Sequence, residues 1–395
     1  MPHLPRALSR RALLTAAAAL TTPAALGPAL SRAAGPAASP REAQLQALLQ
    51  RQLRRLAGRS AARRGASVLV ASPSRGLRVL ARLDPSLPDT FHAASVGKLF
   101  TVALIGQQIE RGQLRLDTPV AGLLPPELLR GLFVVEGQDR AAEVTIRALL
   151  SHTSGAADVF SDPAGPEGNA QQRALAQPDR AWTPEALLEL ARGQRPVGPP
   201  GAHFHYSDTG YLLLGRVLEA QCGAPFPTLA HQRIFSPLGM VRSAYPGRSR
   251  PAEGGPELRP VMLGGVDLSA APALTVDEAG GGASTTEADL LRFLEALFGG
   301  GLLQPETVEA LGQAEHRFVR GLWCGAGLMT WRLGELSPAL RRLPPLRGHM
   351  GVLGVQAFRT VGDDVSVVVH MGSDRANPAS ARLMIAALMA ALRAP

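Results

Sequence analysis

Lysine is almost absent from this chain of 395 residues, in which Lys98 is the only one and every other basic residue is an arginine. Burial can remove the proton from a lysine, whereas the guanidinium of an arginine stays charged. A chain that otherwise uses arginine for positive charge therefore predicts a special role for Lys98. The apolar run 99–105 predicts a buried helix, with Ser95 and Lys98 at positions i and i+3 near its start.

Ser95 and Lys98 together suit an activated nucleophile. A serine hydroxyl reacts readily only when a neighbouring base accepts its proton, and a desolvated lysine one helical turn away can be that base. The start of a helix also offers N–H groups to a developing oxyanion. The alternative is a helix-capping serine followed by an ordinary surface lysine, since this spacing also arises by chance.

Cysteine is scarce as well, with Cys222 and Cys324 as the only two. In an oxidising compartment they could form a disulfide, but two separate core positions explain them as readily. No spacing of cysteine and histidine typical of a metal site accompanies them. We therefore predict neither a metal nor another cofactor.

A stripe of basic and aromatic residues is missing, although the formal net charge is +9 and the pI is about 10.8. The arginines are mixed with acids, as in Arg111, Arg115 and Asp117. Nucleic-acid-binding proteins instead gather their positive charge in one patch. We therefore expect no nucleic acid as a partner and a small molecule or a peptide as the substrate.

A long hydrophobic run is missing too. Arg10 and Arg11 precede a weakly apolar, alanine-rich segment that Pro23 interrupts. This pattern predicts a cleaved, twin-arginine-like export signal within 1–38, with no stable membrane insertion after cleavage. We therefore expect an exported protein, periplasmic or extracellular, whose folded domain spans 39–395.

The apolar patterns place strands at both ends of that domain. Short apolar runs at 66–71 and 77–82, joined by a turn at 72–76, and at 354–361 and 365–371, joined by a turn at 362–364, are typical of two hairpins. A sheet built from both ends requires the middle of the chain to form a separate layer or lobe.

Helical periodicity is found between the strands and beside them, at 41–56, 146–150, 184–192, 211–220, 287–297 and 379–392. The glycine run 280–282 predicts a turn into a capped helix. We expect an α+β fold with an antiparallel sheet flanked by helices (about 39–111 and 312–395) and an inserted, mainly helical lobe (about 112–311).

Partners for the serine and the lysine must come from elsewhere in the chain. Tyr206 lies in a segment rich in polar residues, although taken alone a core tyrosine with a satisfied hydroxyl is the commoner case. His203 and His205 could bind a metal or simply share one face of a short strand. We expect His152 to order a loop through local hydrogen bonds. No Gly-x-Ser-x-Gly elbow is present, which disfavours an α/β-hydrolase.

Three motifs occur in a recognisable order, namely Ser95-Val-Gly-Lys98, Tyr206-Ser-Asp208 and His349-Met-Gly351. With their flanking segments they resemble the serine β-lactamase and penicillin-binding protein superfamily, in the branch of class C β-lactamases, DD-peptidases and related esterases. The resemblance covers about 45–393.

The resemblance implies an active site between the two lobes. Ser95 would be the nucleophile and Lys98 its base, while the Tyr206 hydroxyl would relay protons to the leaving group and help to activate the deacylating water. His349 would tune the electric field around Tyr206.

The resemblance also implies an oxyanion hole formed by the backbone N–H groups of Ser95 and Val352, the latter on the strand after the third motif. Gly351 would let that strand approach the substrate closely. These groups supply what an acyl transfer needs without a metal or cofactor.

Two residues depart from the family pattern and would contact the substrate together with Gly351. Asp208 replaces an asparagine, so it would favour the ammonium form of the lysine if ionised, or donate a hydrogen bond if protonated. Met350 removes a hydroxyl that in many relatives helps to bind a substrate carboxylate, unless Arg347 or Arg359 compensates.

We expect an exported serine hydrolase that acts through an acyl-enzyme on ester or peptide-like substrates, including D-amino acid or β-lactam-related ones. One alternative is a D-alanyl-D-alanine carboxypeptidase or class C-like β-lactamase. Another is a penicillin-binding sensor that is acylated without turnover. A plain binding module would not explain three ordered motifs.

Overall fold

The computed structural model describes residues 39–58, 60 and 63–393. The export signal predicted within 1–38 lies outside these residues. None of the helices in the described part of the chain combines the length and the apolar character needed to cross a membrane.

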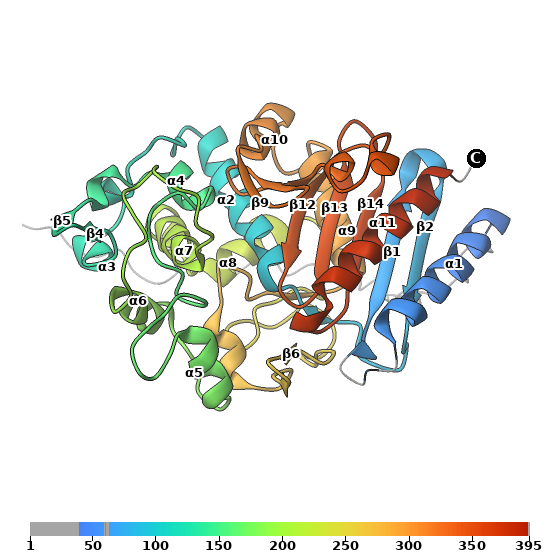
Figure 1. The fold of residues 1–395 in the computed structure, drawn as a ribbon, viewed down its shortest axis with the longest axis horizontal. Coiled ribbons are helices and arrows are strands. Elements are labelled where there is room, and N and C mark those ends of the chain that lie inside the picture. Colours follow the sequence, from blue (N-terminus) through green and yellow to red (C-terminus); the bar gives the residue numbers. More distant parts are fainter. Residues whose placement is uncertain (1–38, 59, 61–62, 394–395) are drawn as a thin grey trace, which may run out of the picture. The chain divides into compact units, whose positions relative to one another are not determined.

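An antiparallel sheet organises the described residues (Figure 1), as predicted. Its strands are β1 (Ser67–Ser72), β2 (Leu77–Arg82), β9 (His316–Val319), β10 (Leu322–Cys324), β11 (Met329–Trp331), β12 (Leu346–Gly351), β13 (Val355–Thr360) and β14 (Ser366–His370). Their order is β2-β1-β14-β13-β12-β11-β10-β9. The N-terminal hairpin therefore pairs directly with the C-terminal one, with Val68 opposite Val369.

Three short strand pairs lie outside this sheet. They are β3 (Phe91–His92) with β8 (Ser284–Thr285), β4 (Val134–Val135) with β5 (Gln138–Asp139), and β6 (Met262–Leu263) with β7 (Val266–Asp267). The first pair leads into the serine motif on one side and follows the glycine run on the other.

The described structure contains the seven helices that the sequence predicted and four others that it did not predict. They are α1 (Pro40–Ala57), α2 (Lys98–Glu110), α3 (Pro126–Leu129), α4 (Ile146–Leu150), α5 (Ala170–Ala176), α6 (Pro184–Arg192), α7 (Asp208–Cys222), α8 (Phe226–Ala230), α9 (Glu287–Phe298), α10 (Pro305–Gly312) and α11 (Asn377–Arg393). α1 begins with a capping box, in which the Ser39 hydroxyl and the Glu42 carboxylate each accept the other's backbone N–H.

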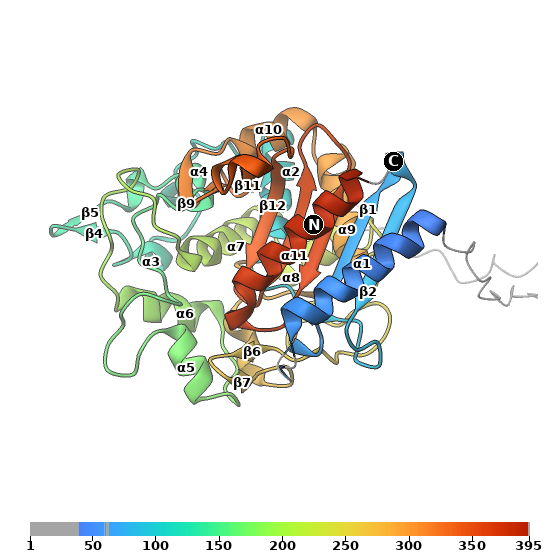
Figure 2. The same cartoon turned by 45° about the vertical axis from the view of Figure 1, so that its right-hand side comes forward.

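Alternation along the strands divides the core into two layers. In β1, Val68 and Val70 point into the layer formed with α1 and α11, whereas Leu69 and Ala71 point into the layer that contains α2 and α9. Figures 1 and 2 show α1 and α11 across one face of the sheet, with α9 on the other. α9 packs against β1, β13 and β14, and α10 packs against α2.

A fully buried ion pair joins the segment before β6 to the start of α9. Arg259 is 2% exposed, and its guanidinium donates to Glu287 Oε1 at 2.7 Å. Its other N–H groups donate to the hydroxyl of Ser67 and to nearby backbone carbonyls. Burial raises the pKa of Glu287, but Arg259 and Arg82 outweigh that effect and lower it to about 2.

The two cysteines are separate free thiols. Cys222 is the last residue of α7, and Cys324 is buried in β10. Burial raises the pKa of the Cys324 thiol to about 12, so it is an unreactive core residue. Of the two predicted alternatives, the structure supports separate positions.

Candidate active site

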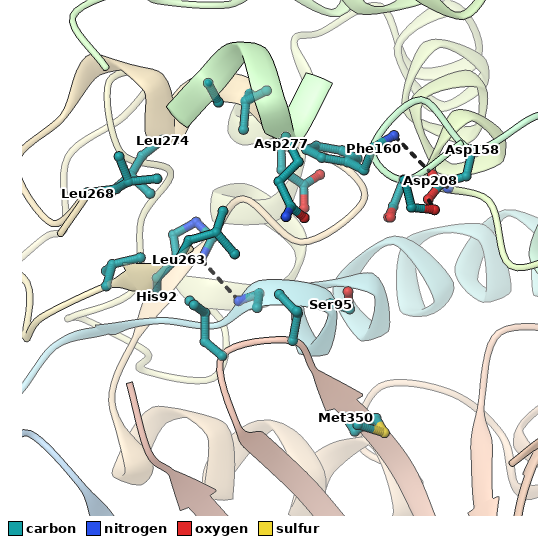
Figure 3. Close-up of a pocket in the computed structure, with 18 of the residues that line it drawn as sticks. His92, Ser95, Asp158, Phe160, Asp208, Leu263, Leu268, Leu274, Asp277 and Met350 are labelled. Carbon is teal, nitrogen blue, oxygen red and sulfur yellow. Dashed lines mark hydrogen bonds between the residues drawn. The ribbon is translucent and has the colours of Figure 1, made fainter. Parts of the chain in front are cut away.

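Ser95 lies in a short 3-10 helix (Ala94–Gly97) that precedes α2, which begins at Lys98. The predicted one-turn spacing is correct, but Ser95 is outside the α-helix. Ala94 has φ 48°, a left-handed conformation that is costly for a residue with a side chain. The Ala94 N–H donates to Nδ1 of His92 at 3.1 Å, which helps to hold this conformation (Figure 3).

The side chain of Lys98 is completely buried, and its ammonium donates to Asp208 and to the carbonyl of Gly280. The ammonium lies 5.2 Å from the centre of the Tyr206 ring. Burial lowers the pKa of Lys98, but Asp208, Tyr206 and Asp277 outweigh it and raise the pKa well above its usual value. The resting site therefore holds an ion pair and not the neutral amine that burial alone would favour.

Asp208 is the first residue of α7, and its carboxylate faces Lys98. Burial raises the pKa of Asp208 to about 6, although Lys98 lowers it. The carboxylate is therefore ionised at neutral pH, which decides between the two states that the sequence left open. The Asp208 N–H donates to Oδ1 of Asp158 at 2.9 Å, so a second carboxylate holds the start of this helix.

Tyr206 lines the same cavity as Ser95, and the Lys98 ammonium lies 5.2 Å from the centre of its ring. Burial raises the pKa of Tyr206, so the phenol is neutral at rest. Its ring stacks on His152 with a centroid separation of 4.1 Å. The Ser207 N–H donates to Nδ1 of His152 at 3.2 Å. The His152 side chain therefore bonds to a distant segment of the chain and not locally, as the sequence had led us to expect. It also stacks on Tyr206, a contact that sequence reasoning missed.

The third motif brings β12 against the backbone of Ser95. A Cβ built on Gly351 would lie 3.2 Å from the Ser95 nitrogen and 2.9 Å from the Ala93 oxygen, so a side chain there would push the strand away. Val352 lies in the turn after β12 and not on a strand, which corrects the prediction. Ser95 and Val352 line the same cavity, as two oxyanion donors must.

His349 and Met350 point to different surroundings, because neighbouring residues of a strand alternate. His349 is buried and its Nδ1 lies 2.6 Å from the Met350 carbonyl oxygen. Burial lowers the pKa of His349 to about 3, so this side chain is a neutral dipole near Lys98. Met350 lines the cavity and presents a thioether where many relatives present a hydroxyl.

Asp277 is a site residue that sequence reasoning missed. A Cβ built on Gly280 would lie 2.6 Å from Oδ1 of Asp277 and 3.0 Å from Oδ1 of Asp208, so both carboxylates close on this glycine. A Cβ on Gly281 would lie 2.4 Å from the Ala94 oxygen. The glycine run predicted as a turn therefore also lets the lysine, two carboxylates and the serine loop approach one another. The glycine run was the feature of the sequence that could have pointed to Asp277.

A cavity of about 380 Å³ opens beside Ser95. Figure 3 shows Leu263, Leu268 and Leu274 gathered on one side of it, and Asp208 and Asp158 on the other. The described residues that line it include three aspartates but no arginine or lysine. The cavity thus has an apolar part and a part whose only fixed charges are negative.

Arg347 and Arg359 do not take the place of the missing hydroxyl. Both line a second cavity, with Asp363 and Asp364. Arg347 Nη1 donates to Oε2 of Glu309 at 2.7 Å, so this guanidinium is already paired. The compensation considered from the sequence is therefore not available.

His203 and His205, which precede the second motif, do not belong to a metal-binding group in the described structure. His205 Nε2 lies 2.7 Å from Oδ2 of Asp162. Among the residues that the structure describes, no group of three or more histidine, cysteine, aspartate or glutamate side chains is placed to hold a metal ion.

Known proteins share this chain's sequence pattern and its fold. A family model described as beta-lactamase matches residues 53–392. The D-stereospecific amidohydrolase from Streptomyces sp. superposes with a TM-score of 0.70 and 24% sequence identity, covering 86% of this chain and 98% of that one. At this level of identity the similarity establishes the fold.

Two curated relatives match shorter stretches. Penicillin-binding protein 4 of Amycolatopsis lactamdurans is 33% identical over 169 residues, which are 43% of this chain and 38% of that protein. The lovastatin esterase of Penicillium rubens is 30% identical over 169 residues, 40% of each chain. The chain therefore spans about two fifths of the length of these relatives.

Proposed function

Because the chain belongs to the beta-lactamase family, we propose that it is a serine hydrolase that forms an acyl-enzyme on Ser95. The observation that carries the proposal is that Ser95 and Tyr206 line one cavity, while the buried Lys98 ammonium lies 5.2 Å from the centre of the Tyr206 ring. A nucleophile, a base and a proton donor to the leaving group thus share one buried cluster.

Acylation proceeds from the small fraction of the enzyme in which Lys98 has lost its proton. The Ser95 hydroxyl gives its proton to the Lys98 amine as its oxygen attacks the substrate carbonyl carbon, and the N–H groups of Ser95 and Val352 bind the oxyanion. Tyr206 then gives its proton to the departing alcohol or amine and regains one from Lys98. The carbonyl–leaving-group bond breaks and leaves an ester on Ser95.

Deacylation uses the same groups in reverse. Tyr206, with its proton moved to Lys98, accepts a proton from a water molecule as that water attacks the acyl carbon. The second tetrahedral intermediate collapses, Ser95 recovers its proton from the Lys98 ammonium, and the acid leaves. The cluster is returned to its starting protonation without a metal or cofactor.

The preferred substrates are esters or amides without a carboxylate close to the scissile bond. Three aspartates and no cationic side chain line the described wall of the cavity, so a substrate carboxylate would meet repulsion and no partner. Esters and amides are also what the names of the lovastatin esterase and the D-stereospecific amidohydrolase imply for those proteins.

A panel of three substrates tests this proposal. We expect p-nitrophenyl butyrate to be hydrolysed with a higher kcat/KM than nitrocefin or a D-Ala-D-Ala peptide, and a fluorophosphonate probe to label the wild type but not Ser95→Ala. A wild type that the probe does not label would exclude the acyl-enzyme. A wild type that prefers nitrocefin or the peptide would support the β-lactamase or carboxypeptidase alternative.

The second candidate is a sensor that is acylated without turnover. The ion pair between Lys98 and Asp208 favours it, because an amine that holds its proton is a poor base. The release of p-nitrophenol from p-nitrophenyl butyrate separates the two candidates. Continued release after an initial burst indicates an enzyme, and a burst of about one equivalent with no further release indicates a sensor.

We also propose that the protein is exported through the paired arginines Arg10 and Arg11. Replacing both with lysine should leave the precursor in the cytoplasm. Export of that variant at the wild-type level would contradict the proposal.

A further inference from the structure

The carboxylate of Asp277 borders the cavity and is not fully satisfied. Its Oδ1 atom is buried and has no hydrogen-bond partner among the described residues. A buried oxygen left unpaired is costly, more so when it is charged. Such an atom beside a cavity next to the nucleophile is a candidate for a ligand contact.

Lys98 makes no hydrogen bond to Asp277 in the described structure. Its ammonium donates to Asp208 and to the Gly280 carbonyl. Lys98 therefore acts on Asp277 through its charge.

Arg248 makes no hydrogen bond to Asp277 in the described structure either. Its Nη2 donates to the carbonyls of Trp182 and Thr275 at 2.8 Å, and its Nε lies 3.3 Å from Oε2 of Glu278. Like Lys98, it acts on Asp277 only at a distance.

The site therefore carries more negative than positive charge. One ammonium, Lys98, faces the two carboxylates of Asp208 and Asp277, and the described lining of the cavity adds Asp158 but no cation. The Asp158 carboxylate accepts the Asp208 N–H and the Ser161 hydroxyl, so its hydrogen bonds are made within the protein. The unpaired acceptor is that of Asp277.

Asp277 is also close to the reacting atoms. A Cβ on Gly281 would lie 2.8 Å from Oδ2 of Asp277 and 2.4 Å from the oxygen of Ala94, the residue before Ser95. One glycine thus separates the carboxylate from the serine loop. A cation paired with Asp277 would therefore lie near a substrate carbonyl group held at Ser95.

We propose that Asp277 binds the ammonium group of the substrate, so that the preferred acyl donors are amides or esters with a primary amine close to the scissile carbonyl and a small apolar side chain. The apolar side chain lies against Leu263, Leu268 and Leu274 (Figure 3). This inference rests on the proposed acyl-enzyme function and names the substrate class of the same site.

Proton binding gives the pairing a pH dependence. Burial raises the pKa of Asp277 to about 7, Asp208 adds to this, and Lys98, the Glu278 N–H and Arg248 lower it. Asp277 therefore loses its proton and becomes negatively charged as the pH rises through about 7. The preference for amines should accordingly be larger at pH 8 than at pH 6.

The test compares alanine p-nitroanilide, in both enantiomers, with propionic p-nitroanilide, which lacks the amine. We expect the wild type to favour the better alanine enantiomer at least tenfold in kcat/KM. Asp277→Asn should lower that ratio about tenfold, mainly through KM for the alanine anilide. Asp277 also helps to raise the pKa of Lys98, and taking the ratio cancels any effect on this base that the two anilides share. Asp363→Asn, an aspartate of the second cavity, is the matched control and should keep the wild-type ratio.

Two results would overturn the inference, namely a wild type without preference for the amine, or an Asp277→Asn variant that loses the same factor on both anilides. The latter would mean that Asp277 serves Lys98 and not the substrate. A thermal melt of each variant excludes misfolding. A binding measurement tests the same contact if turnover is slow. We expect 2-phenylethylamine to slow fluorophosphonate labelling of Ser95 more than 2-phenylethanol does. Equal effects of the two compounds would count against the proposal. Absence of labelling would instead reject the acyl-enzyme function itself.

Discussion

The pairs Arg259–Glu287 and Lys98–Asp208 are both buried ion pairs, yet they differ in how fully they are satisfied. Arg259 directs its N–H groups to Glu287, to a serine hydroxyl and to three backbone carbonyls, and it does not line the cavity beside Ser95. Lys98 donates to Asp208 and to a backbone carbonyl, but Oδ1 of a second carboxylate, Asp277, has no partner beside that cavity.

This difference separates a structural pair from a reactive one. The planar guanidinium of an arginine stays charged and can satisfy several fixed acceptors, which suits a permanent joint between segments. A lysine can gain and lose a proton, and surplus negative charge around it leaves room for a further cation. Mutations should therefore affect stability at Arg259 and turnover at Lys98.

The largest effect is expected from Lys98→Arg. A guanidinium cannot accept the Ser95 proton, so kcat on p-nitrophenyl butyrate should fall about 10²–10⁴-fold, the usual contribution of a general base. Arginine keeps the charge facing Asp208, and circular dichroism and a thermal melt would check that the variant is folded. A folded variant within threefold of the wild-type kcat would contradict the role of Lys98 as base.

At Arg259 the same comparison predicts a loss of stability. Arg259→Met leaves Glu287 buried without its main partner, which should cost roughly 3–5 kcal/mol in the free energy of unfolding, measured by urea denaturation. Arg292→Met removes an arginine that is 43% exposed and pairs with Asp289, so it should cost less than about 1 kcal/mol.

The activity of folded Arg259→Met completes the test. Its kcat at a temperature well below the melting point should stay within about threefold of the wild type, because Arg259 does not line the cavity. If instead stability were unchanged and kcat fell, the division between a structural and a reactive pair would be wrong.

These same residues show how much of the fold and of the site could be predicted from the sequence. The solitary lysine, its spacing from Ser95 and the order of three motifs were sufficient to predict the nucleophile and its neighbours, because these are local or shared with a family. Short apolar runs on either side of turn residues predicted the two hairpins, because such runs are typical of buried strands.

The remaining site features depend on approach across the chain. Asp277 has no motif of its own and reaches Lys98 only because the glycines at 280 and 281 admit close contact. The ionised state of Asp208 depends on the balance between burial and the ion pair, which a sequence does not contain. Likewise, only the register of β12 and β13 shows that Arg347 and Arg359 lie opposite each other, away from the cavity.

Two tyrosines beside Lys98 allow a sharper comparison within the reactive cluster. Tyr206→Phe should lower kcat about 10²-fold or more, since it removes the proton donor to the leaving group. Tyr211→Phe removes a hydroxyl that donates to the Leu150 carbonyl at 3.2 Å, and it should cost about 1 kcal/mol of stability with little change in kcat. Equal kcat losses in the two variants would show that the Tyr206 hydroxyl has no special role.

The smallest effect concerns the charge that distinguishes this site from its relatives. Asp208 raises the pKa of Lys98, so Asp208→Asn should lower that pKa and make the free amine available at lower pH. An opposite charge at this range shifts a pKa by about 1–3 units. The ascending limb of kcat/KM against pH should therefore move to lower pH by about one unit or more, and the rate at pH 7 should rise. Asp277 remains beside Lys98 in this variant, which limits the shift. A limb that stays in place, or moves to higher pH, would mean that the Asp208 carboxylate takes part in the proton transfer itself.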